Sequence, residues 1–207
     1  MLIEMKKMIN HNGLYAYKGA HRSIRQLKRN HSPSVFGYRV WQTSWLMIDF
    51  IKQEGMPQNM NVLEVGCGWG LPSIYCAKTY NASVSCLDAD PEVFPFLQLH
   101  AEANDVDITA INMPFQDITT QNLTGIDVML GVEICFWDSM VPQLMSLIHK
   151  ALSAGVRLIL IADPGRTPFD TLEKNCFDEF HQPAVCWRIQ HPYVAHGRII
   201  KIGSLSR

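Results

Sequence analysis

The chain contains a glycine-rich segment between two acidic residues, and this arrangement could bind a nucleoside-like ligand. Glu64 precedes Gly66, Gly68 and Gly70, and Asp88 follows the last of these glycines. Glycines let the backbone turn sharply and approach a ligand where any Cβ would collide with it. A carboxylate at the end of the next strand can accept hydrogen bonds from both hydroxyls of a ribose. The spacing therefore predicts a turn that holds a ribonucleoside.

A dinucleotide fingerprint is the alternative interpretation of the same glycines. That fingerprint needs a third glycine three positions after the second, and Leu71 occupies this position. The acidic Glu64, two positions before Gly66, also disfavours a pyrophosphate and favours a cationic ligand. An ordinary turn followed by an ordinary aspartate at a strand end is the structural alternative.

These residues lie within a regular alternation of predicted strands and helices. Short apolar runs predict strands at residues 61–65, 82–87, 108–111, 126–132 and 156–161. Apolar residues three and four positions apart predict helices at residues 41–51, 71–79, 93–103, 140–152 and 169–180. Such alternation predicts a mainly parallel sheet with helices on both faces. Residues 184–189 and 198–202 are joined by a loop too short for a crossover helix, so we expect them to pair antiparallel.

Composition restricts the class of protein. The chain has 207 residues, of which 47% are hydrophobic and 18% are charged, as expected for one globular domain. Its six cysteines form no CxxC pair and its eight histidines form no HExxH spacing, so neither a disulfide framework nor a metal site is predicted. No apolar run approaches the roughly 18 to 20 residues of a membrane span, and the first residues lack a secretory signal. We therefore expect a cytoplasmic protein with no membrane partner.

Positive charge is concentrated near the N-terminus. No acidic residue occurs between Glu4 and Asp49, whereas the same stretch contains eight lysines and arginines. We expect residues 1–35 to form a basic N-terminal extension and residues 36–207 to form the main domain. A basic segment can attract acidic proteins or nucleic acid, although most charged segments are simply solvated surfaces.

The run from Glu64 to Gly70, followed by Asp88, resembles the cofactor-binding motifs of class I methyltransferases, which use S-adenosylmethionine (SAM). The predicted antiparallel C-terminal pair is similar to the reversed final hairpin of that family, and the resemblance covers residues 36–203. It implies an α/β fold with a Rossmann-like, doubly wound, mainly parallel sheet of seven strands. It also implies SAM as the cofactor and S-adenosylhomocysteine as the product.

The same resemblance assigns cofactor contacts to three parts of the chain. Glu64 and the glycine turn would cradle the methionine part of SAM, and Asp88 would hold the ribose. The turn residues assigned to the cofactor are Gly66, Cys67, Gly68 and Gly70. The residues that would border the adenine are Phe115, Gln116 and Asp117.

Three further stretches resemble a narrower group. The segment from Phe36 to Trp41 is similar to the leader of methyltransferase family 16, a lysine methyltransferase group in which a tryptophan lies close to the cofactor. The segment from Glu133 to Phe136 is similar to the acidic-x-x-aromatic motif of that group. The segment from Asp163 to Arg166 resembles the corresponding stretch of electron-transfer flavoprotein beta-subunit lysine methyltransferases. Together they imply that the acceptor is a protein lysine and that Trp41 contacts the cofactor.

Lysine methylation would need a group that removes a proton. Methyl transfer from a sulfonium requires a neutral nucleophile about 3 to 3.5 Å from the methyl carbon. A lysine amine has a pKa of about 10.4, so we expect the carboxylate of Glu133 to hold the arriving ammonium and help it to lose its proton. Phe136 is the second predicted catalytic residue, because it and Trp137 could form an aromatic slot for a cation. Asp163 and Arg166, like Trp137, are predicted to contact the substrate.

Each of these residues also has a structural interpretation. Glu133 could cap a helix or pair with a nearby arginine, and Arg166 could anchor its own loop. Trp41 could belong to the core, because tryptophan on an apolar helix is commonly buried. These interpretations lead to different geometries, which the structure distinguishes.

Three classes of function follow from the sequence. A protein-lysine methyltransferase is favoured, a small-molecule N-methyltransferase is second, and a noncatalytic SAM-binding protein is third. The chain lacks the Asn-Pro-Pro-Tyr and Asp-Pro-Pro-Tyr motifs of amino-methylating DNA and RNA enzymes, so nucleic acid is not the expected substrate. We therefore expect a protein partner that carries the methyl acceptor.

Overall fold

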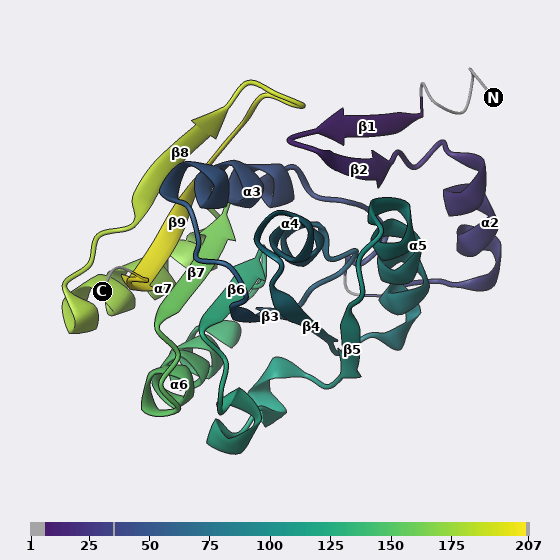
Figure 1. Cartoon of the computed structure of the whole chain (residues 1–207). Coiled ribbons are helices and arrows are strands. Elements are labelled where there is room, and N and C mark those ends of the chain that lie inside the picture. The colour runs from purple at the N-terminus through teal and green to yellow at the C-terminus, as the bar shows by residue number, and fades with distance from the viewer. Residues whose placement is uncertain (1–6, 35, 206–207) are drawn as a thin grey trace.

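A single seven-stranded sheet forms the centre of the computed structural model, which describes residues 7–34 and 36–205 (Figure 1). The strand order is β5-β4-β3-β6-β7-β9-β8. The strands are β3 (Asn61–Val65), β4 (Ser83–Asp88), β5 (Thr109–Asn112), β6 (Val128–Val132), β7 (Leu158–Asp163), β8 (Val185–Ile189) and β9 (Ala195–Gly203). The first five strands pair in parallel, whereas β9 is antiparallel to both β7 and β8. The predicted doubly wound α/β sheet with an antiparallel C-terminal hairpin is confirmed.

Helices cover both faces of the sheet, as the alternating pattern predicts (Figure 1). One face carries α3 (Gln42–Glu54), α4 (Leu71–Tyr80) and α5 (Phe94–Asn104). The other carries α6 (Met140–Ser153) and α7 (Thr167–Phe180). Separate apolar clusters fill the two interfaces, and β6 and β7 are buried along their whole length because both their faces are covered.

The order of the strands creates a crevice between β3 and β6. The chain proceeds from β3 through β4 to β5 in one direction and from β6 to β7 in the other, so the connections diverge at this point. Ligands of open α/β sheets bind outside the carboxyl ends of the strands at such a switch point. The glycine turn follows β3, and Glu133 follows β6, so the topology brings both to the crevice.

Glycine is required at two positions of the turn. Gly66 and Gly70 have φ angles of 61° and 66°, which side chains with a Cβ rarely adopt. A Cβ on Gly70 would lie 2.1 Å from Cδ1 of Leu97, and one on Gly66 would lie 2.6 Å from Cγ2 of Ile134. The turn can therefore pack tightly against α5 and the loop after β6 only if these residues are glycines.

The described part of the predicted N-terminal extension packs on the sheet domain. It forms β1 (Met8–His11), β2 (Leu14–Tyr17) and α2 (Arg22–Asn30), none of which the sequence pattern predicted. Residues 1–6 and 35 of that extension lie outside the described residues. Leu14, Ala16 and Ile24 are buried, and β2 lies against α5. The boundary between residues 35 and 36 stays a prediction.

Two side chains of α5 hold β2 in place. Asn104 accepts a hydrogen bond from the backbone N–H of Tyr15 and donates one to its carbonyl, both at 2.8 Å. His100 accepts from the backbone N–H of Tyr17 at 3.1 Å. Burial lowers the pKa of His100 to about 4, so the ring is neutral at pH 7 and can accept this bond while its other nitrogen donates to the carbonyl of Phe96.

The structure also shows the state of the cysteines, the grouping of possible metal ligands and the character of the helices. All six cysteines are free, and all but Cys186 are buried. No group of three or more His, Cys, Asp or Glu side chains that could hold a metal occurs within residues 7–34 and 36–205. In the same part of the chain, no helix has the length and apolar character needed to cross a membrane.

Candidate functional site

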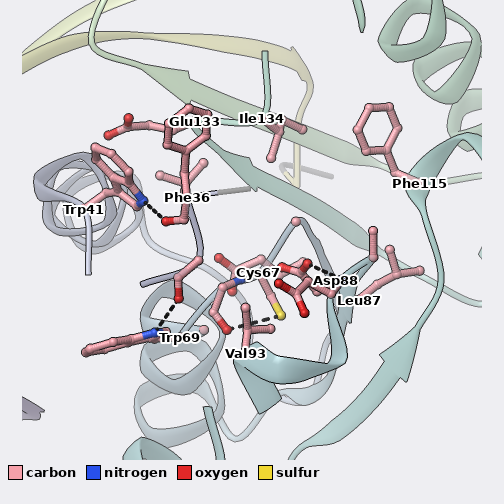
Figure 2. Close-up of a pocket in the computed structure, with 18 of the residues that line it drawn as sticks. Phe36, Trp41, Cys67, Trp69, Leu87, Asp88, Val93, Phe115, Glu133 and Ile134 are labelled. Carbon is pink, nitrogen blue, oxygen red and sulfur yellow. Dashed lines mark hydrogen bonds between the residues drawn. The ribbon is translucent and has the colours of Figure 1, made fainter. Parts of the chain in front are cut away.

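A cavity of about 550 Å³, called the first cavity, lies at the carboxyl ends of β3, β4 and β6 (Figure 2). Many of the predicted site residues line it. They are Trp41, Glu64, Gly66, Cys67, Gly68, Gly70, Asp88, Phe115, Gln116, Glu133 and Phe136. The other predicted site residues, Asp117, Trp137, Asp163 and Arg166, do not line it.

Asp88 ends β4 and is fixed by backbone groups on both of its oxygens. Its Oδ2 accepts from the N–H of Gly68 at 2.9 Å, and its Oδ1 accepts from the N–H of Asp90 at 3.0 Å. Burial raises the pKa of Asp88, and these N–H groups act in the opposite direction. Each carboxylate oxygen has a further lone pair, so two hydroxyls in the first cavity could bind here.

Glu64 lies beneath the glycine turn. Its side chain is buried, and its Oε2 accepts from the backbone N–H of Ser73 at 3.1 Å, in the first turn of α4. Burial raises the pKa of Glu64 to about 7, and the negative charge of Asp88 contributes to the rise. A cation in the first cavity would favour the ionised carboxylate, so Glu64 suits a positively charged ligand.

Phe115 and Trp41 mark opposite sides of the first cavity, with Cys67 and Asp88 between them (Figure 2). Phe115 is buried and Gln116 is exposed at the same side. Asp117 is exposed and does not line the first cavity, although the family resemblance assigns it to the adenine together with these two residues. A flat ring bound beside Phe115 would therefore meet an apolar side chain and an amide rather than a carboxylate.

The segment before α3 closes over the first cavity through contacts that the sequence analysis missed. Ser34 donates to Oδ2 of Asp90 from both its backbone N–H and its hydroxyl. The indole N–H of Trp69 donates to the carbonyl of Gly37 at 2.9 Å. A Cβ on Gly37 would lie 2.5 Å from Cγ1 of Val93, so this approach requires glycine. The sequence feature that could have indicated the contact with Ser34 is a second acidic residue, Asp90, two positions after Asp88.

Trp41 stands at the start of α3 and faces the first cavity (Figure 2). Its indole N–H donates to the carbonyl of Phe36 at 3.2 Å. Phe36 in turn stacks on Phe136, with ring centroids 4.5 Å apart, and Phe136 contacts Trp137 at 5.8 Å. Phe36 and Trp137 are 38% and 50% exposed. The rim of the first cavity therefore carries an exposed aromatic cluster of Phe36, Phe136 and Trp137.

Glu133 is buried and belongs to an ion-pair cluster. Its Oε1 accepts from the hydroxyl of Thr43, and its Oε2 accepts from the guanidinium of Arg166. Arg166 also donates to Asp163 at 2.8 Å. Burial lowers the pKa of Arg166, but the hydrogen bonds and charges of Glu133 and Asp163 outweigh it and leave the pKa raised. The pairing with an arginine, one of the two structural interpretations of Glu133, is therefore present.

Asp163 fixes the loop that carries Arg166. Its Oδ1 accepts from the backbone N–H groups of Gly165 and Arg166, both at 2.8 Å, and the side chain is fully buried. The guanidinium carbon of Arg166 lies 4.5 Å from the ring centroid of Phe136 and 5.9 Å from that of Trp41. Arg166 therefore stands beside the aromatic wall of the first cavity, held there by two carboxylates.

A second cavity of about 620 Å³ adjoins the first. Trp41 and Glu133 line both cavities, and so form part of the wall between them. The far side of the second cavity comes from β1 and β2 and from the loop between β8 and β9, which approach each other in Figure 1. The residues contributed by these elements include Ile9, Ala16, Tyr17, Tyr193 and Val194. A molecule in the second cavity would lie beside Glu133 and Arg166, which both line it.

Comparison with known proteins finds similarity to methyltransferases. Residues 62–155 match the sequence family described as a methyltransferase domain. A ubiquinone biosynthesis O-methyltransferase of Hydrogenovibrio crunogenus is 28% identical over 130 residues, which are 63% of this chain and 50% of the relative. The protein-lysine N-methyltransferase EFM3 of Chaetomium thermophilum is 26% identical over 156 residues, which are 68% of this chain and 46% of the relative. The chain thus spans about half the length of these curated relatives.

The fold also matches a solved structure. The precorrin-6y C5,15-methyltransferase of Geobacter metallireducens superposes with a TM-score of 0.62 at 11% identity, and the match covers 85% of this chain and 95% of that one. At this identity the likeness concerns the fold alone. Because the match covers 85% of this chain, it extends beyond residues 62–155.

Proposed function

We propose that the chain is a SAM-dependent methyltransferase that transfers the methyl group of SAM to an amine, with a protein lysine as the favoured acceptor. The observation that carries the proposal is the position of Glu133. This buried carboxylate lies in the wall between a cavity suited to SAM and a second cavity open to an acceptor.

The residues of the first cavity fit SAM. The carboxylate of Asp88 is held ready to accept from the two ribose hydroxyls. A Cβ on Gly68 would meet no atom within 4 Å, so the turn leaves open space above its backbone for a ligand. Glu64 suits the positive charge at the methionine end, and Phe115 offers an apolar side chain to the adenine. The volume of about 550 Å³ lies within the range of small-molecule sites.

When bound, SAM would supply a methyl group on a sulfonium, and a neutral amine could attack the methyl carbon in line and displace the thioether. The amine nitrogen forms the new bond to carbon as the sulfur–carbon bond breaks, and the sulfur keeps the electron pair. A lysine arrives as an ammonium and would have to lose one proton before its nitrogen attacks. Glu133 can hold that ammonium and accept the proton, because each of its oxygens has a lone pair beyond those used by Thr43 and Arg166.

The charge of the cluster favours an incoming cation. Two carboxylates, Glu133 and Asp163, pair with the single guanidinium of Arg166, which leaves one net negative charge in a buried setting. An ammonium beside Glu133 would balance it, because opposite charges interact strongly where water is scarce. The rings of Trp41 and Phe136 next to Arg166 could also stabilise a cation over their faces.

The exposed aromatic cluster supports a macromolecular acceptor. Phe36 and Trp137 present apolar rings at the surface, and large exposed aromatic residues are enriched at protein interfaces. The similarity to a protein-lysine methyltransferase supports the same acceptor. Trp137 would then contact the substrate protein at the rim, while Arg166 and Asp163 would act by positioning Glu133.

A small-molecule acceptor is the second candidate. It is favoured by the second cavity, whose volume of about 620 Å³ would accommodate a whole small molecule between the N-terminal hairpin and the loop before β9. The similarity to a ubiquinone biosynthesis O-methyltransferase points in the same direction.

One labelling experiment separates these candidates. The protein is incubated with methyl-labelled SAM and a cell lysate that has been divided by dialysis into macromolecules and small molecules. Label in the macromolecular fraction that protease releases, and that amino-acid analysis recovers as methyllysine, supports the favoured acceptor. Label confined to the dialysate supports the small-molecule candidate. Absence of transfer from bound SAM to either fraction contradicts both, and Asp88→Ala serves as the inactive control.

A further inference from the structure

Charge around the first cavity is strongly unbalanced. The carboxylates of Glu64, Asp88, Asp90 and Glu133 all line it. Among the described residues of the lining, Arg39 is the single lysine or arginine. SAM carries an α-carboxylate as well as its ammonium and sulfonium. Binding this carboxylate among four others needs a positive partner, because an unpaired anion in such a site is repelled and poorly solvated.

The guanidinium of Arg39 can be that partner, because it stacks on aromatic rings and pairs with no carboxylate of the described residues. Its central carbon lies 3.8 Å from the ring centroid of Trp41 and 5.8 Å from that of Tyr38. Arg39 forms no ion pair with any carboxylate of residues 7–34 and 36–205. Stacking fixes the plane of the guanidinium and leaves its N–H edge for a planar anion. A carboxylate can bind such an edge through two parallel hydrogen bonds.

The first turn of α3 adds only a partial positive charge beside Arg39. The helix has 13 residues, and no side chain caps its first turn at Trp41. Trp41 and Ser44, on that turn, line the first cavity. The uncapped N–H groups at the start of a helix carry a partial positive charge and bind anions. On this turn the N–H of Ser44 already donates to the carbonyl of Trp41, and the hydroxyl of Thr43 donates to Glu133. Arg39 therefore carries the full positive charge among the described residues that line the first cavity.

We propose that Arg39 binds the α-carboxylate of SAM, and so directs the methionine end of the cofactor toward Glu64. This inference rests on the proposed function only in taking SAM as the ligand. Arg39 also lines the second cavity, so the competing assignment is an anionic group on the acceptor. The two assignments differ in whether removal of Arg39 weakens cofactor binding.

Decarboxylated SAM tests the assignment, because it keeps the adenosine, sulfonium and amine and lacks only the carboxylate. Calorimetry measures the affinity of both ligands for the wild type and for Arg39→Gln. We expect Arg39→Gln to weaken SAM about 10-fold or more and to change decarboxylated SAM less than about 2-fold, as for a charged hydrogen bond to the missing group. Arg39→Lys, which keeps the charge and loses the planar fork, should be intermediate. Arg25→Gln, an exposed residue of α2 that lines neither cavity, is the matched control.

Three results would overturn the assignment. Equal weakening of both ligands by Arg39→Gln and Arg39→Lys would make Arg39 a structural support for Trp41. Unchanged SAM affinity in both variants would assign Arg39 to the acceptor. A wild type that binds neither ligand would contradict the proposed function as well, which distinguishes that failure from the first two.

Discussion

Glu133 and Arg166, 33 residues apart in the sequence, form an ion pair in the wall between the two cavities. The pair joins the loop after β6 to the loop after β7, and Asp163 and Thr43 complete its hydrogen bonds. Glu133 has a φ of 54°, a conformation that non-glycine residues seldom adopt, and its backbone N–H bonds to the carbonyl of Ala162 at 2.8 Å. Residues held in this conformation are found preferentially at functional sites.

The first prediction concerns this carboxylate. Glu133→Gln should lower single-turnover methyl transfer by about 10² to 10⁴-fold, the scale of a positioned acid–base group, while SAM affinity stays within about 2-fold. Stability should fall by about 1.5 to 3 kcal/mol, because the hydrogen bond from Arg166 to position 133 no longer has a charged acceptor. Thr43→Val is the matched control, since it removes a hydrogen bond to Glu133 and leaves the charge in place. Transfer that stays intact per folded molecule of Glu133→Gln would make the carboxylate purely structural.

The second prediction concerns Asp88. Asp88→Ala should weaken SAM binding by about 1.5 to 3 kcal/mol, because it removes the acceptor of two ribose hydroxyls and frees the N–H of Gly68. Isothermal calorimetry measures the change. Asp107→Ala, which removes an exposed carboxylate that does not line the first cavity, should leave the affinity unchanged. Equal affinities for wild type and Asp88→Ala would rule out ribose binding at Asp88.

The third prediction concerns pH and Glu64. Its pKa is raised to about 7 in the folded protein, so between its ordinary value and about 7 the folded state holds a proton that the unfolded chain has released. The contribution of Glu64 to stability therefore falls as pH rises through this window. SAM brings positive charge that favours the ionised form, so SAM binding should release a proton and tighten as pH rises toward about 7.

Glu64→Gln provides the comparison for this pH effect. Calorimetry across pH values from about 6 to 8, in buffers with different ionisation enthalpies, should detect proton release for the wild type and less for Glu64→Gln. The same proton release in both proteins would show that Glu64 does not change its ionisation when SAM binds.

The fourth prediction concerns the glycine turn. Gly70→Ala should destabilise the protein by about 2 to 4 kcal/mol, because the new Cβ meets Leu97 in addition to adopting a left-handed conformation. Gly155 also has a positive φ, but a Cβ there meets nothing within 4 Å. Gly155→Ala should therefore cost only about 1 to 2 kcal/mol, and denaturant unfolding compares the two. Equal losses would remove the packing argument for Gly70.

The sheet domain was predictable because its signals are local. Strand and helix runs such as Asn61–Val65 and Leu71–Tyr80 have the right period. Gly66 follows the strand and Gly70 precedes the helix, so these bounds could be predicted almost to the residue. The N-terminal hairpin was missed, although Asn12 and Gly13 form the two-residue turn that favours hairpins and have φ angles of 53° and 76°. Its strands have only four residues each, too short for a clear alternation of apolar and polar residues.

The positions of several site residues could be predicted from the sequence, but the partners of their hydrogen bonds could not. Asp88 and the glycines lie where a strand-end motif places them. The bonds from Arg166 to Glu133 and from Ser34 to Asp90 join residues 33 and 56 positions apart, and only the packed sheet brings them together. Asp117 shows the converse, because it is adjacent in sequence to Gln116 and yet does not line the first cavity.

The most direct test of the central claim is whether SAM binds the purified protein. Thermal unfolding is measured with SAM, S-adenosylhomocysteine and NAD, each added to the wild type. The account predicts that SAM and S-adenosylhomocysteine stabilise the fold, by about 2.7 kcal/mol at 100 times the dissociation constant, and that NAD has no effect. Stabilisation by NAD without stabilisation by SAM would contradict it.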